Sequence, residues 1–561
     1  MKTRVAYTRW FDHLNSDDVS EVGGKNASLG EMIGALKNKG IQVPDGFATT
    51  ADAYRSFVKR NDLADKIQNE LQELQAGNQP LSQAGSKIRK LFLKSKFPED
   101  LETDIREAYR ALCERYETEE VNVAVRSSAT AEDLPSASFA GQQETFLNIN
   151  GEDDLLDACR RCYASLFTDR AISYRQNQGF DHMKVALSVG VQKMVRSDKA
   201  SAGVIFTIDQ ETGFPNVVTI NASWGLGESV VGGTVTPDEY VVFKPLLSEP
   251  QFAPIIGRTI GAKETRIIYA DGKGRQTTKT VNNSPKQQRT RVLTDEEILY
   301  LARQAVEIEN HYGQPMDIEW AKDGESGDLF IVQARPETVQ SQKKGTTLRD
   351  YQLKSEATPM VTGLSIGQAI VTGKVSRIES TDDIERFEKG NILVTSATDP
   401  DWVPIMKKAA GIVTDYGGRT SHAAIVSREL SIPAVIGTGN ATEELNNGQE
   451  VTLSCGEGEQ GNVYDGILEY EESEINLEKL PDTRTQVMMN IASPAASFRW
   501  WQLPCEGIGL ARMEFIINNV IKIHPMALVR FPDLEDKDAV KQIKNLTKGY
   551  TDKTEYFVDH L

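Results

Sequence analysis

The sequence contains six histidines, and one of them, His422, stands where a strand is expected to give way to a helix. It lies within GIVTDYGGRTSHAAIVSREL (residues 411–430), where an apolar run is followed by two adjacent glycines that permit a tight turn. Thr420 or Ser421 can cap the helix that follows. The pattern therefore predicts that His422 occupies the first turn of a helix.

The first turn of a helix suits a histidine that carries a phosphoryl group. The positive end of the helix dipole and the free N–H groups favour the neutral, nucleophilic imidazole and stabilise an attached anion. Arg419 can add charge-assisted hydrogen bonds to phosphoryl oxygens, and Ala423 and Ala424 leave room around the ring. A lone histidine is more often a polar surface or core residue, and the residues alone leave that alternative open.

Two further segments contain residues that suit the phosphates of a nucleotide. EVGGKNASLGEMI places Lys25 after two glycines and ahead of an expected amphipathic helix, so its amine can reach a phosphate over the helix N-terminus. VAVRSSATAEDLPSASFAGQQETFLN puts Arg126 at the end of a strand, followed by a loop of small residues with Thr145 beyond it, a composition fit for a lid. Gly-Gly-Lys turns and polar surface loops are common, so a reading without a ligand also stays open.

A third segment supplies residues that could hold a metal ion. DIEWA, followed by LFIVQARPET, contributes Glu319, Gln333 and Arg335 from two adjacent strand-like runs. A carboxylate and an amide oxygen can hold Mg²⁺ while Arg335 meets the phosphates. On spacing alone, these residues fit the polar positions of an edge strand equally well.

Composition limits the partners of the chain. The net charge of −18 opposes nonspecific binding to nucleic acid or anionic membranes, so neither is expected and any phosphate site must be local. No apolar run is long enough to span a bilayer, and no basic-then-apolar leader opens the chain, which predicts a cytoplasmic protein. The five cysteines suit a reducing compartment, and Cys159 and Cys162 are expected to pack within a helix.

The 561 residues are too many for one ordinary core, and the patterns divide them into three parts. Residues 1–340 mix helical segments with short β-branched runs and predict a large α/β region. Residues 355–470 predict a small α/β unit with strands NILVTS, GIVTDYGG, IPAVIG and EVTLSC and helices DWVPIMKKAA and HAAIVSREL. The flanking polar stretches suit a domain that moves, although composition alone favours linkers that merely separate domains. Residues 486–561 read as the start of a (β/α)8 barrel, which needs about 250 residues.

One motif points to a known family. GGRTSHAAIVSR resembles the phosphohistidine motif of the phosphoenolpyruvate-utilising enzymes, and TDPDWVPIMKKAAGIVTD before it is similar to the phosphoenolpyruvate synthases among them. The resemblance implies that residues 355–470 form a swivelling domain and that His422 is phosphorylated during turnover. It also implies that Thr420 is a target of a bifunctional regulatory kinase and phosphorylase. Tyr416 and Ser421 stand where Arg and Cys are common, and neither carries the chemistry.

The resemblance extends over essentially the whole chain. Residues 1–340 resemble the ATP-grasp-like domain of pyruvate phosphate dikinase and phosphoenolpyruvate synthase, with Glu228 as a polar contact. On that resemblance, Glu319 and Gln333 hold Mg²⁺, and the ATP contacts are Lys25, Arg126, Thr145, Gln192 and Arg335, with Gln192 on the adenine side. EGIGLARMEF resembles the first strand and turn of the pyruvate-binding barrel, where Arg512 matches an arginine that holds the substrate's carboxylate or phosphate.

The implied reaction converts ATP, pyruvate and water to AMP, phosphoenolpyruvate and phosphate, with Mg²⁺ as cofactor. The barrel's acidic metal ligands and its proton-donating cysteine would lie beyond Leu561. The 561 residues are therefore expected to form phosphohistidine from ATP but not to make phosphoenolpyruvate.

Three alternatives remain. A rifampin phosphotransferase shares the ATP and histidine domains, but the stretch from VMMNIASP to GIGLARMEF favours the pyruvate barrel. Pyruvate phosphate dikinase, which uses phosphate in place of water, is not distinguished by individual residues, although the overall match is closer to the synthase. A phosphocarrier that passes phosphate to a partner protein lacks an ATP-grasp half, so DIEWA and VQARPET count against it.

Overall fold

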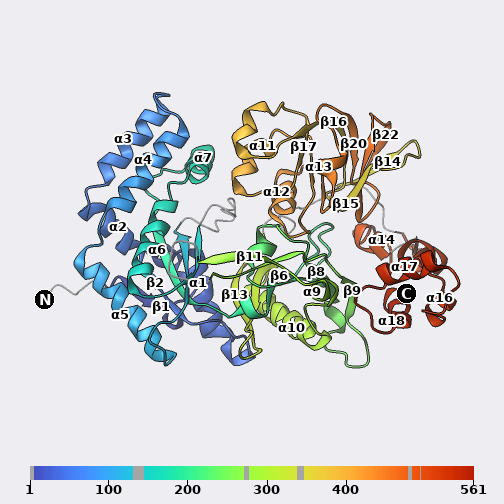
Figure 1. The fold of residues 1–561 in the computed structure, drawn as a ribbon, viewed down its shortest axis with the longest axis horizontal. Helices are drawn as coiled ribbons and strands as arrows, with labels where there is room; N and C mark the ends of the chain where they lie inside the picture. Colours follow the sequence, from blue (N-terminus) through green and yellow to red (C-terminus); the bar gives the residue numbers. More distant parts are fainter. Residues whose placement is uncertain (1–5, 131–143, 271–276, 338–346, 478–482, 493) are drawn as a thin grey trace.

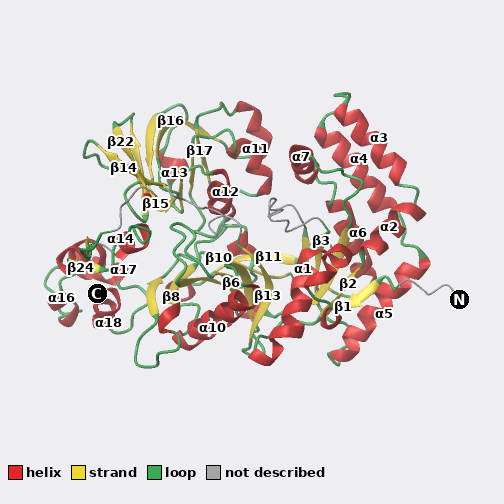
Figure 2. Ribbon diagram, turned by 180° about the vertical axis from the view of Figure 1, so that it is seen from behind, coloured by secondary structure: helices red, strands yellow, loops and turns green. Residues whose placement is uncertain are grey.

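The computed structural model describes residues 6–130, 144–270, 277–337, 347–477, 483–492 and 494–561. They form a multidomain α/β chain in which the helices of residues 51–115 and those of residues 525–560 lie at opposite ends of the molecule (Figures 1 and 2). Most of the predicted lid falls on residues 131–143, outside the described residues. Among the described helices, none combines the length and the apolar character needed to cross a membrane.

The first lobe packs a layer of helices against an antiparallel sheet with strand order β1-β2-β5-β3-β4. The strands are β1 Thr8–Trp10, β2 Gly46–Thr49, β3 Val123–Ala129, β4 Thr145–Ile149 and β5 Leu187–Lys193. The helices are α1 Val19–Glu31, α2 Ala51–Arg60, α3 Ala64–Gln75, α4 Leu81–Lys94, α5 Glu99–Arg115, α6 Glu152–Ser165 and α7 Asp169–Gln178. One apolar core joins β2, β3 and β5 to helices α2 through α7.

Residues 152–178 form two helices, α6 and α7, rather than one continuous helix. Thr168 lies between them, and its side chain accepts a hydrogen bond from the backbone N–H of Ala171, so it caps α7. A capping residue satisfies an otherwise unpaired N–H and favours a new helix start. Cys159 and Cys162 are fully buried in α6, as predicted from their helical spacing.

The second lobe is an antiparallel sheet of order β13-β12-β6-β7-β8-β9. Its strands are β6 Ser201–Phe206, β7 Val217–Trp224, β8 Asp238–Phe243, β9 Ile255–Thr259, β12 Met316–Lys322 and β13 Leu329–Pro336, with a separate hairpin of β10 Thr265–Tyr269 and β11 Thr278–Asn282. The helices are α8 Glu228–Val231, α9 Pro285–Arg289 and α10 Asp295–Tyr312. The buried face of α10 packs on the sheet, and a capping box of Thr294 and Glu297 fixes its start.

A closed barrel forms between residues 361 and 465, with strand order β15-β19-β18-β17-β16-β20-β21. Its strands are β15 Val361–Ile366, β16 Ile370–Arg377, β17 Ile392–Thr395, β18 Gly411–Thr414, β19 Ala434–Ile436, β20 Glu450–Ser454 and β21 Gln460–Asp465, and its helices are α11 Val403–Met406, α12 His422–Leu430 and α13 Ala441–Glu444. The four predicted strands are present as β17 to β20. The helix expected over DWVPIMKKAA shrinks to α11 and a preceding 3-10 turn, because the chain must enter β18 at Gly411.

The polar stretches on either side of the barrel pair with each other. β14 Thr347–Leu353 and β22 Tyr470–Asn476 form an antiparallel ribbon, with Thr347 opposite Asn476 and Leu353 opposite Tyr470. Strand pairing satisfies the backbone polar groups without an apolar face, which is why polar composition alone indicated linkers.

The C-terminal segment begins with a parallel pair of strands, β23 Met489–Ile491 and β24 Ile508–Ala511. Its helices are α14 Pro494–Arg499, α15 Met513–Ile516, α16 Pro525–Val529, α17 Lys537–Leu546 and α18 Lys553–His560. A strand, a helix and a parallel strand in succession are compatible with the start of a (β/α)8 barrel. That barrel stays a prediction.

Candidate functional site

A cavity of about 550 Å³ opens between the sheets of the two N-terminal lobes. Residues from β3, β4 and β5 line one side, and residues from β6, β12 and β13 line the other. Five residues singled out from the sequence lie in its wall: Arg126, Thr145, Gln192, Glu228 and Glu319. Its volume and its mixed apolar and polar lining suit a nucleotide.

Arg126 joins the two lobes at this cavity. Its guanidinium donates to the Glu319 carboxylate at 3.1 Å, to the Gln333 amide oxygen at 2.5 Å and to the Val332 carbonyl oxygen at 3.0 Å. Glu319 and Gln333 stand opposite each other in the register of β12 and β13. The structure therefore brings together one predicted phosphate contact and both predicted metal ligands.

Arg335 lies outside the lining of the cavity and pairs with Asp317, at 2.7 and 2.9 Å. Burial raises the pKa of Asp317, and the Arg335 charge opposes that rise. Sequence reasoning missed Asp317. The signal was available, because Asp317 and Glu319 are two residues apart in a strand and so share one face.

Lys25 also lies outside the lining, within α1 rather than ahead of it. The helix begins at Val19 but is interrupted at Gly23, whose φ of 76° is left-handed. A Cβ at Gly23 would stand 2.3 Å from the Ser128 Oγ, so only glycine allows α1 to approach β3 this closely. Lys25 therefore follows a break that is pressed against the strand of Arg126.

The oxygen donors near Arg126 fit magnesium. Glu319 and Gln333 offer a carboxylate and an amide oxygen that reach the same guanidinium. Among the residues that the structure describes, no group of three or more His, Cys, Asp or Glu side chains is arranged to hold a metal ion. This donor set suits a cation that shares its coordination with substrate phosphates, as Mg²⁺ usually does.

His422 is the first residue of α12, as predicted. Ser421 caps the helix by accepting from the Ala424 N–H, and the His422 Nδ1 lies 2.9 Å from the Thr398 hydroxyl. Burial, and after it the charge of Arg170, lower the pKa of His422 to about 4. The imidazole is thus neutral at pH 7, although the principal cause is burial rather than the helix dipole named from the sequence.

His422 is not among the residues that line the cavity, but the start of its helix lies next to that lining. Gly232 lines the cavity, and its neighbour Gly233, with a φ of 65°, abuts Ser421 so closely that a Cβ there would lie 2.4 Å from the Ser421 Cβ. Arg170 lines the same cavity and is the charge that acts on His422. The barrel thus presents the start of α12 to the two N-terminal lobes.

A buried ionic seam holds the barrel against the second lobe. Glu211 accepts from the Arg428 Nε and from the Gly367 N–H, each at 3.0 Å, and the Arg419 Nε lies 3.5 Å from the Glu239 carboxylate. Although burial opposes ionisation, Arg428 and Arg419 hold the pKa of Glu211 below its ordinary value.

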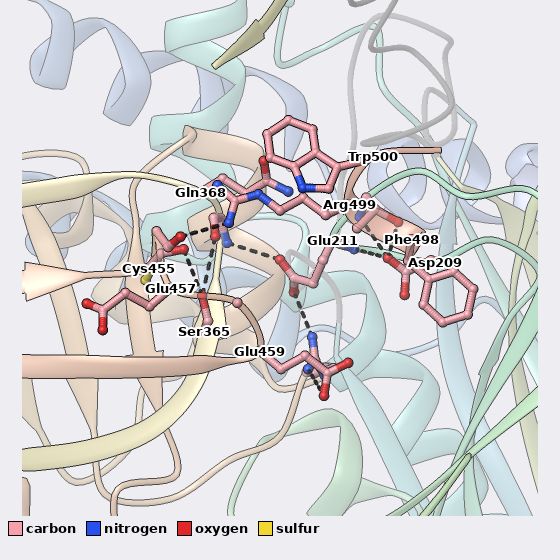
Figure 3. A pocket seen from close by; sticks show the side chains of 15 residues that line it. Asp209, Glu211, Ser365, Gln368, Cys455, Glu457, Glu459, Phe498, Arg499 and Trp500 are labelled. Carbon is pink, nitrogen blue, oxygen red and sulfur yellow. Dashed lines mark hydrogen bonds and ion pairs between the residues drawn. The ribbon is translucent and has the colours of Figure 1, made fainter. Parts of the chain in front are cut away.

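Arg419, expected from the sequence to meet phosphoryl oxygens, faces carboxylates instead. It belongs to a second cavity of about 270 Å³, drawn in Figure 3, where Glu211 projects toward the barrel loops. This cavity is lined by Glu211 and Arg419 of the ionic seam, and it is separate from the cavity that contains Arg126.

Two family models match the chain: pyruvate phosphate dikinase, AMP/ATP-binding domain, over residues 19–355, and PEP-utilising enzyme, mobile domain, over residues 387–458. Relatives named phosphoenolpyruvate synthase are 52% identical in Synechocystis (100% of this chain, 70% of the relative), 52% in Aquifex aeolicus (97% and 65%) and 50% in Escherichia coli (98% and 69%). The chain belongs to the phosphoenolpyruvate synthase family.

Membership of the synthase family confirms the resemblance identified from the sequence and the prediction of an ATP-binding phosphotransferase. The relatives favour the synthase over the dikinase, rifampin and phosphocarrier alternatives. The chain spans 65% to 70% of the length of these three synthases.

Two further predicted residues, Thr420 and Arg512, are not among those that line the cavity. Thr420 is 2% exposed, and within the part of the chain that the structure describes its hydroxyl has no hydrogen-bond partner. Arg512 is exposed at the point where β24 leads into α15. Their predicted roles, regulation and substrate binding, stay predictions. Sequence reasoning missed Arg170, Thr398 and Glu211, because each acts through a contact between distant segments.

Proposed function

We propose that this chain transfers the β-phosphoryl group of ATP to His422, the first stage of phosphoenolpyruvate synthesis from ATP, pyruvate and water. One observation carries the proposal: His422 begins a helix whose cap, Ser421, abuts Gly233 beside the cavity that contains Arg126 and Glu319. A neutral imidazole next to a cationic phosphate site is arranged for nucleophilic attack on phosphorus.

Each side of the cavity has its own part in binding ATP. Gln192 and the apolar residues near it, Met194 and Leu226, provide the surface for adenine. Arg126 and Thr145 hold the phosphates, and Lys25 and Arg335 approach them from the flanks. Glu319 and Gln333 would hold Mg²⁺, which neutralises phosphate charge when bound.

His422 acts as the covalent carrier. In the tautomer whose Nδ1–H donates to Thr398, the lone pair is on Nε2. Nε2 bonds to the β-phosphorus as the bond to the oxygen shared with the α-phosphate breaks, and AMP leaves. Water then releases the terminal phosphate, which leaves phosphohistidine. The protein's contribution is chiefly position and charge, as in other phosphoryl transfers.

The second stage requires the closed barrel that contains His422 to move away from the N-terminal lobes. Phosphohistidine would leave the cavity and deliver its phosphoryl group to enolpyruvate held by Arg512. The β14–β22 ribbon is the connection through which a swivelling domain would turn. Gluconeogenesis is the pathway that this direction of reaction serves, in the cytoplasm.

Regulation at Thr420 would depend on the same movement. The residues on either side of Thr420 face the second lobe: a Cβ on Gly418 would lie 3.0 Å from the Pro237 side chain, and Ser421 abuts Gly233. A regulatory kinase would therefore reach the buried Thr420 hydroxyl only after the barrel leaves this surface.

Incubation with Mg²⁺ and ATP labelled on the β-phosphate tests the proposal. We expect acid-labile label on the protein, release of AMP, and loss of both with His422→Ala. Formation of ADP without protein label would contradict it, because an ordinary kinase or ATPase cleaves the terminal phosphate only.

A further inference from the structure

Arg170 has an unusual position at the start of α7. It is the second residue of the helix, after the Thr168 cap, and it lines the ATP cavity together with Arg126 and Thr145. Its side chain is 20% exposed, and its Nε is buried and has no hydrogen-bond partner among the described residues. A donor in this state is available to a ligand that enters the cavity.

The charge of Arg170 is poorly balanced by the protein. The helix dipole opposes a cation in the first turn of α7. Its only ion pair among the described residues is with Asp401 of the barrel, 3.9 Å away, and the Asp401 side chain is 65% exposed. Such a pair contributes little, because solvent screens it. Neither the stability of α7 nor the ion pair with Asp401 of the barrel therefore accounts for an arginine at position 170.

Arg170 connects the two reacting partners. It stands in the wall of the cavity in which ATP is proposed to bind, and it is close enough to His422 to act on that imidazole through its charge. Arg126, the other arginine of the wall, is instead directed at Glu319 and Gln333 on the far lobe. Of these two cationic groups, only Arg170 faces the barrel.

We propose that Arg170 is a catalytic residue that binds the oxygens of the β-phosphoryl group while it passes from ATP to His422. This inference rests on the proposed function. As the bond from the β-phosphorus to the AMP oxygen breaks and the bond to Nε2 forms, Arg170 offers a planar fork of donors to the phosphoryl oxygens and takes no proton. Its charge also favours the unprotonated nucleophile.

Single-turnover formation of phosphohistidine from β-labelled ATP in the full chain tests this role. We expect Arg170→Ala to lower the rate constant by about 10²- to 10³-fold, the range for loss of one charge-stabilising donor, with ATP affinity within about tenfold of the unsubstituted chain. Arg170→Lys should lie between the two, because it keeps the charge but loses the fork. Added ethylguanidinium should restore part of the rate in Arg170→Ala.

Two control variants separate the alternatives. Arg55→Ala removes an exposed arginine of α2, paired with Asp52 on the outside of the same lobe, and should leave the rate unchanged. Asp401→Ala removes the partner of Arg170 on the barrel. If Asp401→Ala slows labelling as much as Arg170→Ala and the double variant is no slower, Arg170 acts by docking and the proposal is overturned.

The remaining outcomes are equally distinct. Labelling by Arg170→Ala within threefold of the unsubstituted chain overturns the catalytic role and leaves the proposed function intact. No labelling by the unsubstituted chain overturns the proposed function itself and this inference with it. Should Arg170→Ala fail to fold by circular dichroism, Arg170→Gln and Arg170→Lys with the same two measurements decide the question.

Discussion

The low pKa of His422 predicts that acid separates the barrel from the N-terminal lobes. The pKa is about 4 in the docked arrangement, because the ring is buried and Arg170 of the other lobe is near, against 6.5 for an ordinary histidine. Between these values the undocked form binds more protons than the docked form. The histidine's contribution to docking is therefore fully present above about pH 6.5 and is lost as the pH falls from 6.5 toward 4.

The magnitude follows from the two pKa values. Lowering the pH from 7.5 to 5.5 should reduce the docking equilibrium constant about tenfold, or about 1.4 kcal/mol. Burial raises the pKa of the seam carboxylate Glu239, which contributes with the opposite sign. His422→Asn, which cannot titrate in this range, isolates the histidine contribution from the carboxylate contribution.

Energy transfer between two dyes measures the docked fraction. Lys66→Cys in α3 and Lys389→Cys in the barrel place one exposed label on the first lobe and one on the barrel, and Cys505→Ser removes the one native cysteine that is not buried. We expect the transfer to fall with acid in the parent and to change much less in His422→Asn. An equal fall in both proteins, or none in the parent, would refute the link between His422 and docking.

Three other substitutions test separate parts of the site. Thr398→Val removes the partner of the His422 Nδ1 and should slow phosphohistidine formation about tenfold at unchanged ATP affinity, measured by single turnover. Glu319→Gln should raise the Mg²⁺ concentration needed for ATP binding about tenfold, measured by calorimetry; an unchanged Mg²⁺ requirement would remove Glu319 from the metal site. Gly233→Ala places a Cβ against Ser421 and strains a positive φ, so it should lower the docked fraction without changing ATP binding.

Local features of the site were predictable from the sequence. The turn before His422 and the residue that caps its helix are determined by neighbouring residues in the sequence. The start of α12 could therefore be predicted from a few positions. Glu319 and Gln333 were predictable as neighbours because two strands joined by a short turn tend to pair, and they do so in register.

The contacts between lobes were not predictable in this way. Glu211 meets Arg428, which is 217 residues away, and Arg170 meets a barrel whose position no local pattern specifies. Hydrophobic periodicity indicates which face of a helix or strand is buried. It does not indicate which charged residue from a distant segment will contact that helix or strand. For the same reason, the ribbon of β14 and β22 was interpreted as two linkers.

The β14–β22 ribbon would limit the directions in which the closed barrel can move toward a second site. Each of its strands has seven residues, about 23 Å of paired chain. If the two strands were separate flexible linkers of that length, the closed barrel could move in any direction about them. A paired ribbon resists twisting, so it would restrict the closed barrel to motion along an arc. The effective concentration of phosphohistidine at an acceptor on that arc rises accordingly, and at positions off the arc it approaches zero.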